Sequence, residues 1–149
     1  MQPLPHHYSV HADGLLTGVT VVSAAGVPPL QVAAPLQFDG PVGLWSPETL
    51  LVGAVAECFV LTFRTVARAA GFPWRRLQCD VEGTLARSDG ELRFTGFTIR
   101  ADLTVLTECD LMRAQGLLQR AERNCLIGNS LRAARTLELQ VHAHPAAAA

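Results

Sequence analysis

Lysine is missing from this sequence, because all 12 basic residues are arginine. That absence excludes mechanisms that need a lysine Schiff base or a P-loop lysine. Charge of either sign is scarce, with a formal net charge of -1 and a pI near 6.5. Such a balance creates no long-range field to gather nucleic acid. The cysteines at positions 58, 79, 109 and 125 form no Cys-x-x-Cys or Cys-x-x-His pair, so we expect neither a metal site nor a cofactor.

Long uninterrupted apolar runs are also lacking. The most apolar stretch, Leu50 to Phe63, contains Glu57 and is soon followed by Arg64 and Arg68. We therefore expect it to be too short and too charged to span a bilayer, and predict no membrane partner. The first residues lack the basic start and apolar run of a secretion signal. These features favour a cytoplasmic protein whose cysteines are free thiols or a working redox pair.

What is present suits one domain over residues 1–149, with peripheral tails at about 1–5 and 145–149. Apolar residues make up 49% of the 149 positions, enough for one core. Residues 7–12 and 15–23 are β-leaning runs around Asp13-Gly14, which is typical of a tight hairpin turn. A third run, about 30–38, follows a Gly/Pro segment. The opening third is thus predicted to be a three-stranded meander.

A long helix is predicted next. Ser46-Pro47-Glu48 is a strong helix start, and Gly71 followed by Pro73 is an equally clear stop. The helix between them is apolar on nearly every side, so it must be covered nearly all round. A chain of this length has limited material for that cover, and we therefore predict an intimate homodimer.

Alternation returns at 74–87 and 91–106, around the turn signal Ser88-Asp89-Gly90. A second helix is predicted over 107–123, then a bend with a helical turn over 125–134, and a last strand over 136–142. The predicted fold class is α+β, in the order βββ-α-ββ-α-β.

Three segments in this order resemble the OsmC/Ohr family of thiol peroxidases: Ser46-Pro47-Glu48-Thr49-Leu50-Leu51, Ala56-Glu57-Cys58-Phe59, and Ala121 to Leu131 with Cys125 inside it. The resemblance implies two long helices packed against curved antiparallel sheets in an intertwined homodimer, with active sites at the subunit interface. By position, Cys58 matches the family's peroxidatic cysteine, Cys125 its resolving cysteine and Glu48 its helix-start acid.

The reaction implied by the resemblance reduces an organic hydroperoxide to an alcohol and leaves a sulfenic acid on Cys58. Cys125 then condenses with it to a disulfide, which an external dithiol, in this family often a lipoyl-type carrier, reduces. The apolar helix favours hydrophobic hydroperoxides. The rival hypothesis is a non-catalytic dimer that binds an apolar small molecule or senses oxidants.

Activation of Cys58 is the open question, because an unperturbed thiol is only roughly 3% thiolate at neutral pH. Cys58 is too far inside its helix for the helix dipole to act on it. The family's N-terminal arginine is missing, since no Arg or Lys precedes Arg64. Its replacement could be a protonated His6, His7 or His11, or an arginine from another segment of either subunit; otherwise activation has been lost.

The remaining candidates have plainer interpretations. Cys79 and Cys109 are predicted to be structural or incidental thiols. His142 and His144 form an H-x-H pair, but no third ligand candidate is near them in the sequence, which argues against a metal site.

Overall fold

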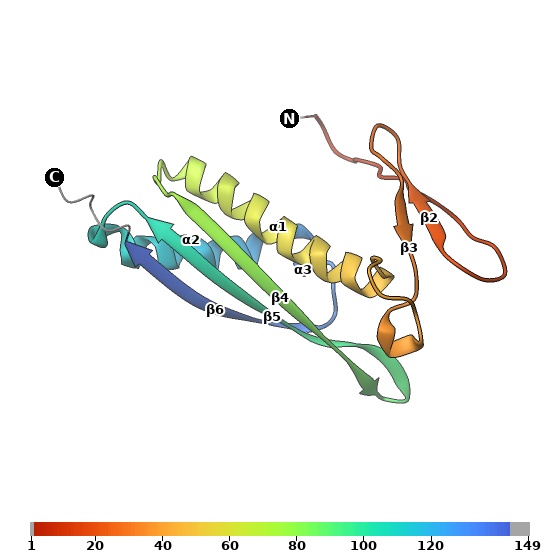
Figure 1. Cartoon of the computed structure of the whole chain (residues 1–149). Helices are drawn as coiled ribbons and strands as arrows, with labels where there is room; N and C mark the ends of the chain where they lie inside the picture. The colour runs from red at the N-terminus through yellow and green to blue at the C-terminus, as the bar shows by residue number, and fades with distance from the viewer. Residues whose placement is uncertain (1, 144–149) are drawn as a thin grey trace. The chain divides into compact units, whose positions relative to one another are not determined.

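The computed structural model describes residues 2–143, with only the backbone of Cys109 (Figure 1). The described chain divides into two compact units, one ending at Leu51 and the other beginning at Val52. The single domain over residues 1–149 stays a prediction. The predicted tail from residue 145 lies outside the described residues.

The first unit contains a three-stranded antiparallel sheet in the order β1-β2-β3, made of His11–Asp13, Thr20–Ser23 and Leu30–Val32. The predicted meander is confirmed, but its strands are shorter than expected. Asp13-Gly14 is not a two-residue turn, because Asp13 still pairs with Val21 and the positive φ falls at Gly18. The third strand stops at Val32, since Pro35 precedes a short 3-10 helix, η1, over Leu36–Phe38.

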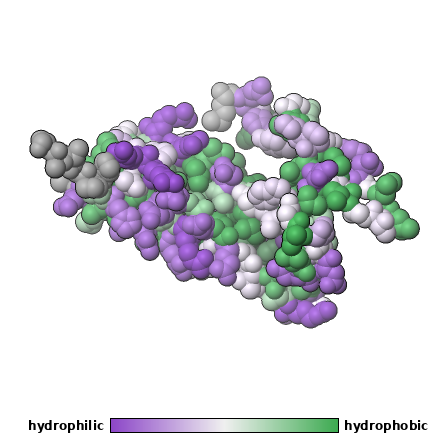
Figure 2. All heavy atoms as spheres, in the orientation of Figure 1, coloured by the Kyte–Doolittle hydropathy of each residue, from purple (hydrophilic) through white to green (hydrophobic). Residues whose placement is uncertain are grey.

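Little of this first unit is buried. Its buried residues are Val32, Ala33 and Ser46. Many large apolar side chains are exposed instead, and Figure 2 shows green spheres on the surface of this unit. They are Leu4, Tyr8, Val10, Leu15, Leu16, Val19, Val21, Val27, Leu36, Phe38, Val42 and Trp45. A small sheet with so little core does not gain enough from burial to be stable by itself.

Helix α1 runs over Pro47–Ala69, as predicted. Ser46 Oγ accepts the Thr49 amide at 3.2 Å, and the Ser46 amide in turn donates to Thr49 Oγ1 at 2.8 Å. This reciprocal pair satisfies two amides at the helix start. At the other end Gly71 has a φ of 54°, which closes the helix with a left-handed residue.

By length and composition alone, α1 could cross a membrane. Its most apolar 18-residue stretch has a mean hydropathy of 1.8. The expectation that this segment is too short is therefore wrong, because the helix continues past Arg64 and Arg68 to Ala69. The core helix of a globular protein passes the same test, and α1 has five buried residues: Val55, Phe59, Phe63, Val66 and Ala67.

The second unit contains a three-stranded sheet in the order β4-β5-β6, made of Arg76–Ser88, Glu91–Val105 and Ala134–Ala143. The predicted turn between β4 and β5 is confirmed, with positive φ at Asp89 and Gly90. The expectation of wholly antiparallel sheets is wrong in one detail, because β6 pairs parallel to β5. The 28 residues between β5 and β6 form the crossover that this pairing needs. A parallel pair requires a connection of about a dozen residues or more, whereas an antiparallel pair can be joined by a short turn.

That crossover contains a 3-10 turn, η2, over Glu108–Asp110, then α2 over Leu111–Asn124 and α3 over Leu126–Asn129. The predicted second helix and the helical turn after it are both confirmed. Helix α2 contacts β5 and β6. Val52 of α1 lies close to Gly83 of β4, where a Cβ would be 2.9 Å from its methyl group. The two helices therefore cover the same face of the sheet.

The core of the second unit lies between that face and the helices. Alternate residues of β5 are buried there, which gives the period of two expected of a sheet with one covered face: Phe97, Ile99, Ala101, Leu103 and Val105. The opposite face is polar, and Arg100 on β5 bonds Glu82 on β4 and Glu138 on β6. The α+β fold in the order βββ-α-ββ-α-β is confirmed.

Candidate active site

Cys58 and Cys125 are brought together in the second unit, from segments far apart in the sequence. Cys58 is half-buried about three turns into α1, and Cys125 is 1% exposed at the junction of α2 and α3. The two side chains lie close enough for each thiol to affect the pKa of the other. Both are free thiols. The sequence resemblance matched these two cysteines by position alone, and the fold makes them neighbours.

The short helix α3 presents its first amides to Cys58. The Ile127 amide donates to Cys58 Sγ at 3.4 Å, and the Thr62 hydroxyl lies 4.0 Å from the same sulfur. Burial raises the pKa of Cys58, but the hydrogen bonds from the Ile127 amide, the Cys125 thiol, the Thr62 hydroxyl and the Leu126 amide lower it by more. The net result is a pKa below the ordinary thiol value.

Cys125 has the opposite tendency. Burial and the neighbouring Cys58 thiol raise the pKa of Cys125 to about 11, although the Gly128 amide and the Arg135 charge act to lower it. The thiolate of the pair is therefore favoured on Cys58, the more exposed sulfur. This asymmetry suits an attacking thiol on α1 and a resolving thiol beneath it.

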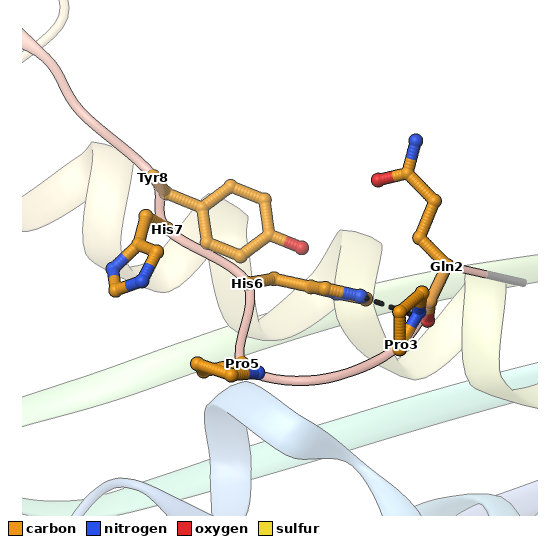
Figure 3. Close-up of a pocket in the computed structure, with 6 residues that line it drawn as sticks. All are labelled: Gln2, Pro3, Pro5, His6, His7 and Tyr8. Atoms are coloured by element: carbon orange, nitrogen blue, oxygen red, sulfur yellow. Dashed lines mark hydrogen bonds between the residues drawn. The ribbon is translucent and has the colours of Figure 1, made fainter.

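Sequence reasoning sought a cation for Cys58 and missed the backbone donors. The structure supplies hydrogen bonds from the start of α3 instead. Every residue except proline has a main-chain amide, so residue type does not show which amide will donate to a thiol. The predicted bend after Cys125 was the one relevant signal in the sequence. The histidine alternatives belong to the first unit, where Gln2, Pro3, Pro5, His6, His7 and Tyr8 line a cavity of about 440 Å³ (Figure 3).

In that cavity His6 Nε2 donates to the Gln2 carbonyl at 3.1 Å, and the rings of His6 and His7 point to different sides of the chain (Figure 3). All of His6, His7 and His11 are exposed. Whether any of them approaches a thiol stays a prediction.

Glu48, the third matched position, lies in the first turn of α1. Its Oε2 atom is buried and has no hydrogen-bond partner among residues 2–143. A buried carboxylate oxygen without a donor is costly, so this position suits a donor from outside the described chain. Its role at the site stays a prediction.

A groove of about 600 Å³ opens beside Cys58. Its walls come from one side of α1 and from the end of α2 with the start of α3. Among the described residues that line it, Arg120 is the charged one. The others are Cys58, Leu61, Thr62, Thr65, Val66, Ala69, Asn124 and Leu126. A small, largely apolar molecule could therefore lie against the Cys58 sulfur.

Within residues 2–143 no group of three or more His, Cys, Asp or Glu could hold a metal ion. His142 instead pairs with Asp102 at 3.5 Å on the polar face of the sheet. His144 and the Cys109 side chain lie outside the described residues.

A family model described as OsmC-like protein matches residues 40–140. The chain belongs to the OsmC-like family. The matched span includes Glu48, Cys58 and Cys125 of this OsmC-like chain. Among curated relatives, the uncharacterized protein YmaD of Bacillus subtilis is 25% identical over 115 residues, which cover 75% of each chain. Peroxiredoxin OsmC of Escherichia coli is 26% identical over 105 residues, covering 70% of this chain and 72% of that one.

Solved structures confirm the fold of this OsmC-like chain. An OsmC-like protein of unknown function from Vibrio cholerae has a TM-score of 0.81 at 15% identity, covering 92% of this chain and 99% of that one. An organic hydroperoxide resistance protein OsmC from Legionella pneumophila has a TM-score of 0.74 at 23% identity, covering 94% and 99%. Members of the family are thus associated with peroxide and redox stress.

Cys79, which is not part of the thiol pair, should make the stability of the fold depend on pH. Burial, Asp80, Cys125 and Glu57 raise the pKa of Cys79 to about 12. Above the unfolded pKa of about 8.5, the folded thiol keeps a proton that the unfolded one loses, so stability should fall as pH rises. The limiting slope is about 1.4 kcal/mol per pH unit. Urea denaturation under reducing conditions from pH 8 to 11 should give Cys79→Ala a flatter decline than wild type; parallel declines would contradict this.

Proposed function

We propose that this OsmC-like chain is a thiol-dependent peroxidase that reduces organic hydroperoxides to alcohols. The proposal rests on the surroundings of the Cys58 sulfur. This sulfur accepts a hydrogen bond from an amide of α3, lies near the Cys125 thiol and lines a largely apolar groove. Hydrogen bonds of this kind favour the thiolate, the nucleophilic form of cysteine. The names of the relatives add support, since they include a peroxiredoxin and a hydroperoxide resistance protein.

The reaction begins when the Cys58 thiolate attacks the terminal peroxide oxygen. The O–O bond breaks, the alkoxide takes a proton from solvent and leaves as the alcohol, and Cys58 becomes a sulfenic acid. The Cys125 sulfur then attacks the Cys58 sulfur and expels the hydroxyl group as water, which forms a disulfide. An external dithiol, proposed to be a lipoyl-type carrier, reduces the disulfide by two successive thiol exchanges and is itself oxidised.

The test is hydroperoxide consumption by the purified protein with dihydrolipoamide as the dithiol. We expect saturable turnover of cumene hydroperoxide, with kcat/KM at least about tenfold above that for hydrogen peroxide, because the groove can bury the cumyl group. Consumption no faster than in a protein-free control would refute the peroxidase. If a fluorescent fatty acid then bound saturably beside Cys58, the non-catalytic binding protein would be the better description.

Arg120 should determine which hydroperoxides bind well. It is the charged residue of the groove, so a fatty-acid hydroperoxide can place its carboxylate there. Arg120→Gln should raise KM for that substrate about two- to fivefold, the effect of one exposed ion pair. KM for uncharged cumene hydroperoxide should not change. Arg123→Gln is the matched control, since Arg123 is exposed on the same helix but does not line the groove. An equal rise for both substrates would contradict this assignment.

The active form is proposed to be a homodimer. The first unit exposes many large apolar side chains, including Leu15 at 89% and Leu16 at 100%. In the most apolar stretch of α1 only 28% is buried within the chain, and Leu61 beside Cys58 is 52% exposed. Apolar surface of this extent is typical of a protein interface. A second copy of the chain is the proposed cover, as the resemblance to the family implies.

Sedimentation and small-angle scattering test the dimer. We expect the mass of two chains at micromolar concentration, and dissociation or aggregation in Leu61→Arg. Gln119→Arg changes an exposed polar residue of α2 and serves as the control. A stable, monodisperse wild-type monomer would refute the proposed dimer.

The proposed compartment is the cytoplasm, where the three described free thiols would stay reduced between turnovers.

A further inference from the structure

Arg135, on the last strand β6, reaches back to the segment that carries the thiol site. Its side chain is 17% exposed. Nε donates to Glu122 Oε1 at 2.8 Å, and one terminal nitrogen donates to Asn129 Oδ1 at 3.0 Å. The other terminal nitrogen donates to the Gly128 carbonyl oxygen. All three guanidinium nitrogens are thus used, by partners that lie between residues 122 and 129.

The partners of Arg135 lie on both sides of Cys125. Glu122 belongs to the last turn of α2, whereas Gly128 and Asn129 belong to α3. Helix α3 has four residues and no side-chain cap at its start, so it has little stability of its own. The same four residues include Ile127, whose amide donates to the Cys58 sulfur. What holds α3 against α2 therefore also holds the donor at the nucleophile.

We propose that Arg135 is the positioning residue of the thiol site: by joining Glu122 to Gly128 and Asn129, it fixes the turn whose Ile127 amide donates to Cys58. It does not touch the nucleophile and acts through the turn. The inference rests on the proposed role of Cys58 as the attacking thiol. The family's N-terminal arginine is missing from this chain, and Arg135 on β6 is proposed to support the site instead, by holding the turn in place.

Gly128 gives independent support. A Cβ at this position would be 3.0 Å from Arg135 Nε, 3.1 Å from Cδ and 3.3 Å from Cζ. The guanidinium therefore lies close to the Gly128 α-carbon, and a methyl group at this position would make it shift by a few tenths of an ångström. The charge also acts on the second thiol: burial dominates the raised pKa of Cys125, but the Arg135 charge lowers it.

That charge matters when the disulfide is reduced. Cys58 is the more exposed sulfur, so an incoming thiolate reaches it first and forms a mixed disulfide with it. The bond between Cys58 and Cys125 breaks, and Cys125 leaves as a thiolate that then takes a proton. A nearby cation stabilises this leaving group. The Arg135 charge is the smallest of the named influences on the Cys125 pKa, so the main role proposed for Arg135 is to hold the turn.

The test measures Cys58 without any peroxide. Iodoacetamide labelling of the reduced protein is followed from pH 6 to 10, and Cys58 is quantified by peptide mass spectrometry. Arg135→Gln should shift the profile to higher pH and slow labelling at pH 7 about tenfold, the effect of losing a hydrogen bond to a charged group. Arg135→Lys keeps the charge without the fork and should recover less than half of that loss. Arg132→Gln, an exposed control, should match wild type.

A second pair of variants covers the case in which Arg135→Gln does not fold. Gly128→Ala displaces the guanidinium and should slow Cys58 labelling in the same direction. Gly116→Ala is its control, because nothing lies within 4 Å of the added Cβ on α2. If Arg135→Gln or Gly128→Ala folds and labels like its control, the inference is overturned. A shifted labelling profile in a protein without hydroperoxide turnover would refute the proposed function and leave the positioning role standing.

Discussion

Replacing Cys58 by serine should lower hydroperoxide turnover at least about a thousandfold, because a serine hydroxyl at this position has no base to activate it. Cys125→Ser should behave differently. The first step remains, so one equivalent of hydroperoxide should be consumed in a burst and a sulfenic acid should persist on Cys58. A dimedone adduct, located by peptide mass spectrometry, detects it.

Cys79→Ser is the control for both variants, since Cys79 lies on β4 and no hydrogen bond joins it to Cys58 among the described contacts. It should retain most of the wild-type turnover. Wild-type turnover in both Cys58→Ser and Cys125→Ser would show that the reaction does not use this pair. Loss of turnover in Cys58→Ser without a trapped sulfenic acid in Cys125→Ser would leave the nucleophile assigned and the resolving thiol wrong.

Phe63→Ala should be among the most damaging single changes to stability. Phe63 is fully buried on α1 and meets Trp74 edge to face, with ring centroids 5.3 Å apart. Truncation removes the ring and leaves a cavity, at a cost of about 3–5 kcal/mol in the free energy of unfolding. That is a large fraction of the stability of an ordinary domain. Urea denaturation followed by circular dichroism measures it.

Met112→Ala is the matched control, since Met112 is 86% exposed on α2. It should change the free energy of unfolding by less than about 0.5 kcal/mol. A loss at Phe63 no greater than that at Met112 would mean that the helix-to-sheet core is not where the stability of the second unit lies.

Local signals in the sequence were sufficient for most of the second unit. The helix start at Ser46 and its stop at Gly71 were both predicted, and so was the turn at Asp89-Gly90. In each case one or two residues with special backbone chemistry determine the local structure. The parallel pairing of β6 was not predicted, because strand direction depends on the crossover between β5 and β6.

The first unit and the thiol site were harder to predict. The strands of the first unit are short and exposed, so their ends are not marked by a change from buried to exposed residues. At the site, the resemblance supplied Cys58 and Cys125, but the amide of Ile127 and the bonds of Arg135 have no residue pattern. A network that joins α1, α3 and β6 exists only after the chain has folded, whereas pattern analysis compares near neighbours.

The place of β6 in the chain has a consequence for synthesis. Strands β4 and β5 are joined by a tight turn and can pair as soon as they leave the ribosome, whereas β6 pairs with residues such as Arg100 across a separation of 38 positions. Arg135 emerges with β6, after both cysteines. Until then the turn around α3 lacks the bonds that Arg135 makes to Glu122, Gly128 and Asn129. On the proposal that Arg135 holds this turn, we expect Cys58 of an unfinished chain to react more slowly with oxidants than Cys58 of the folded protein.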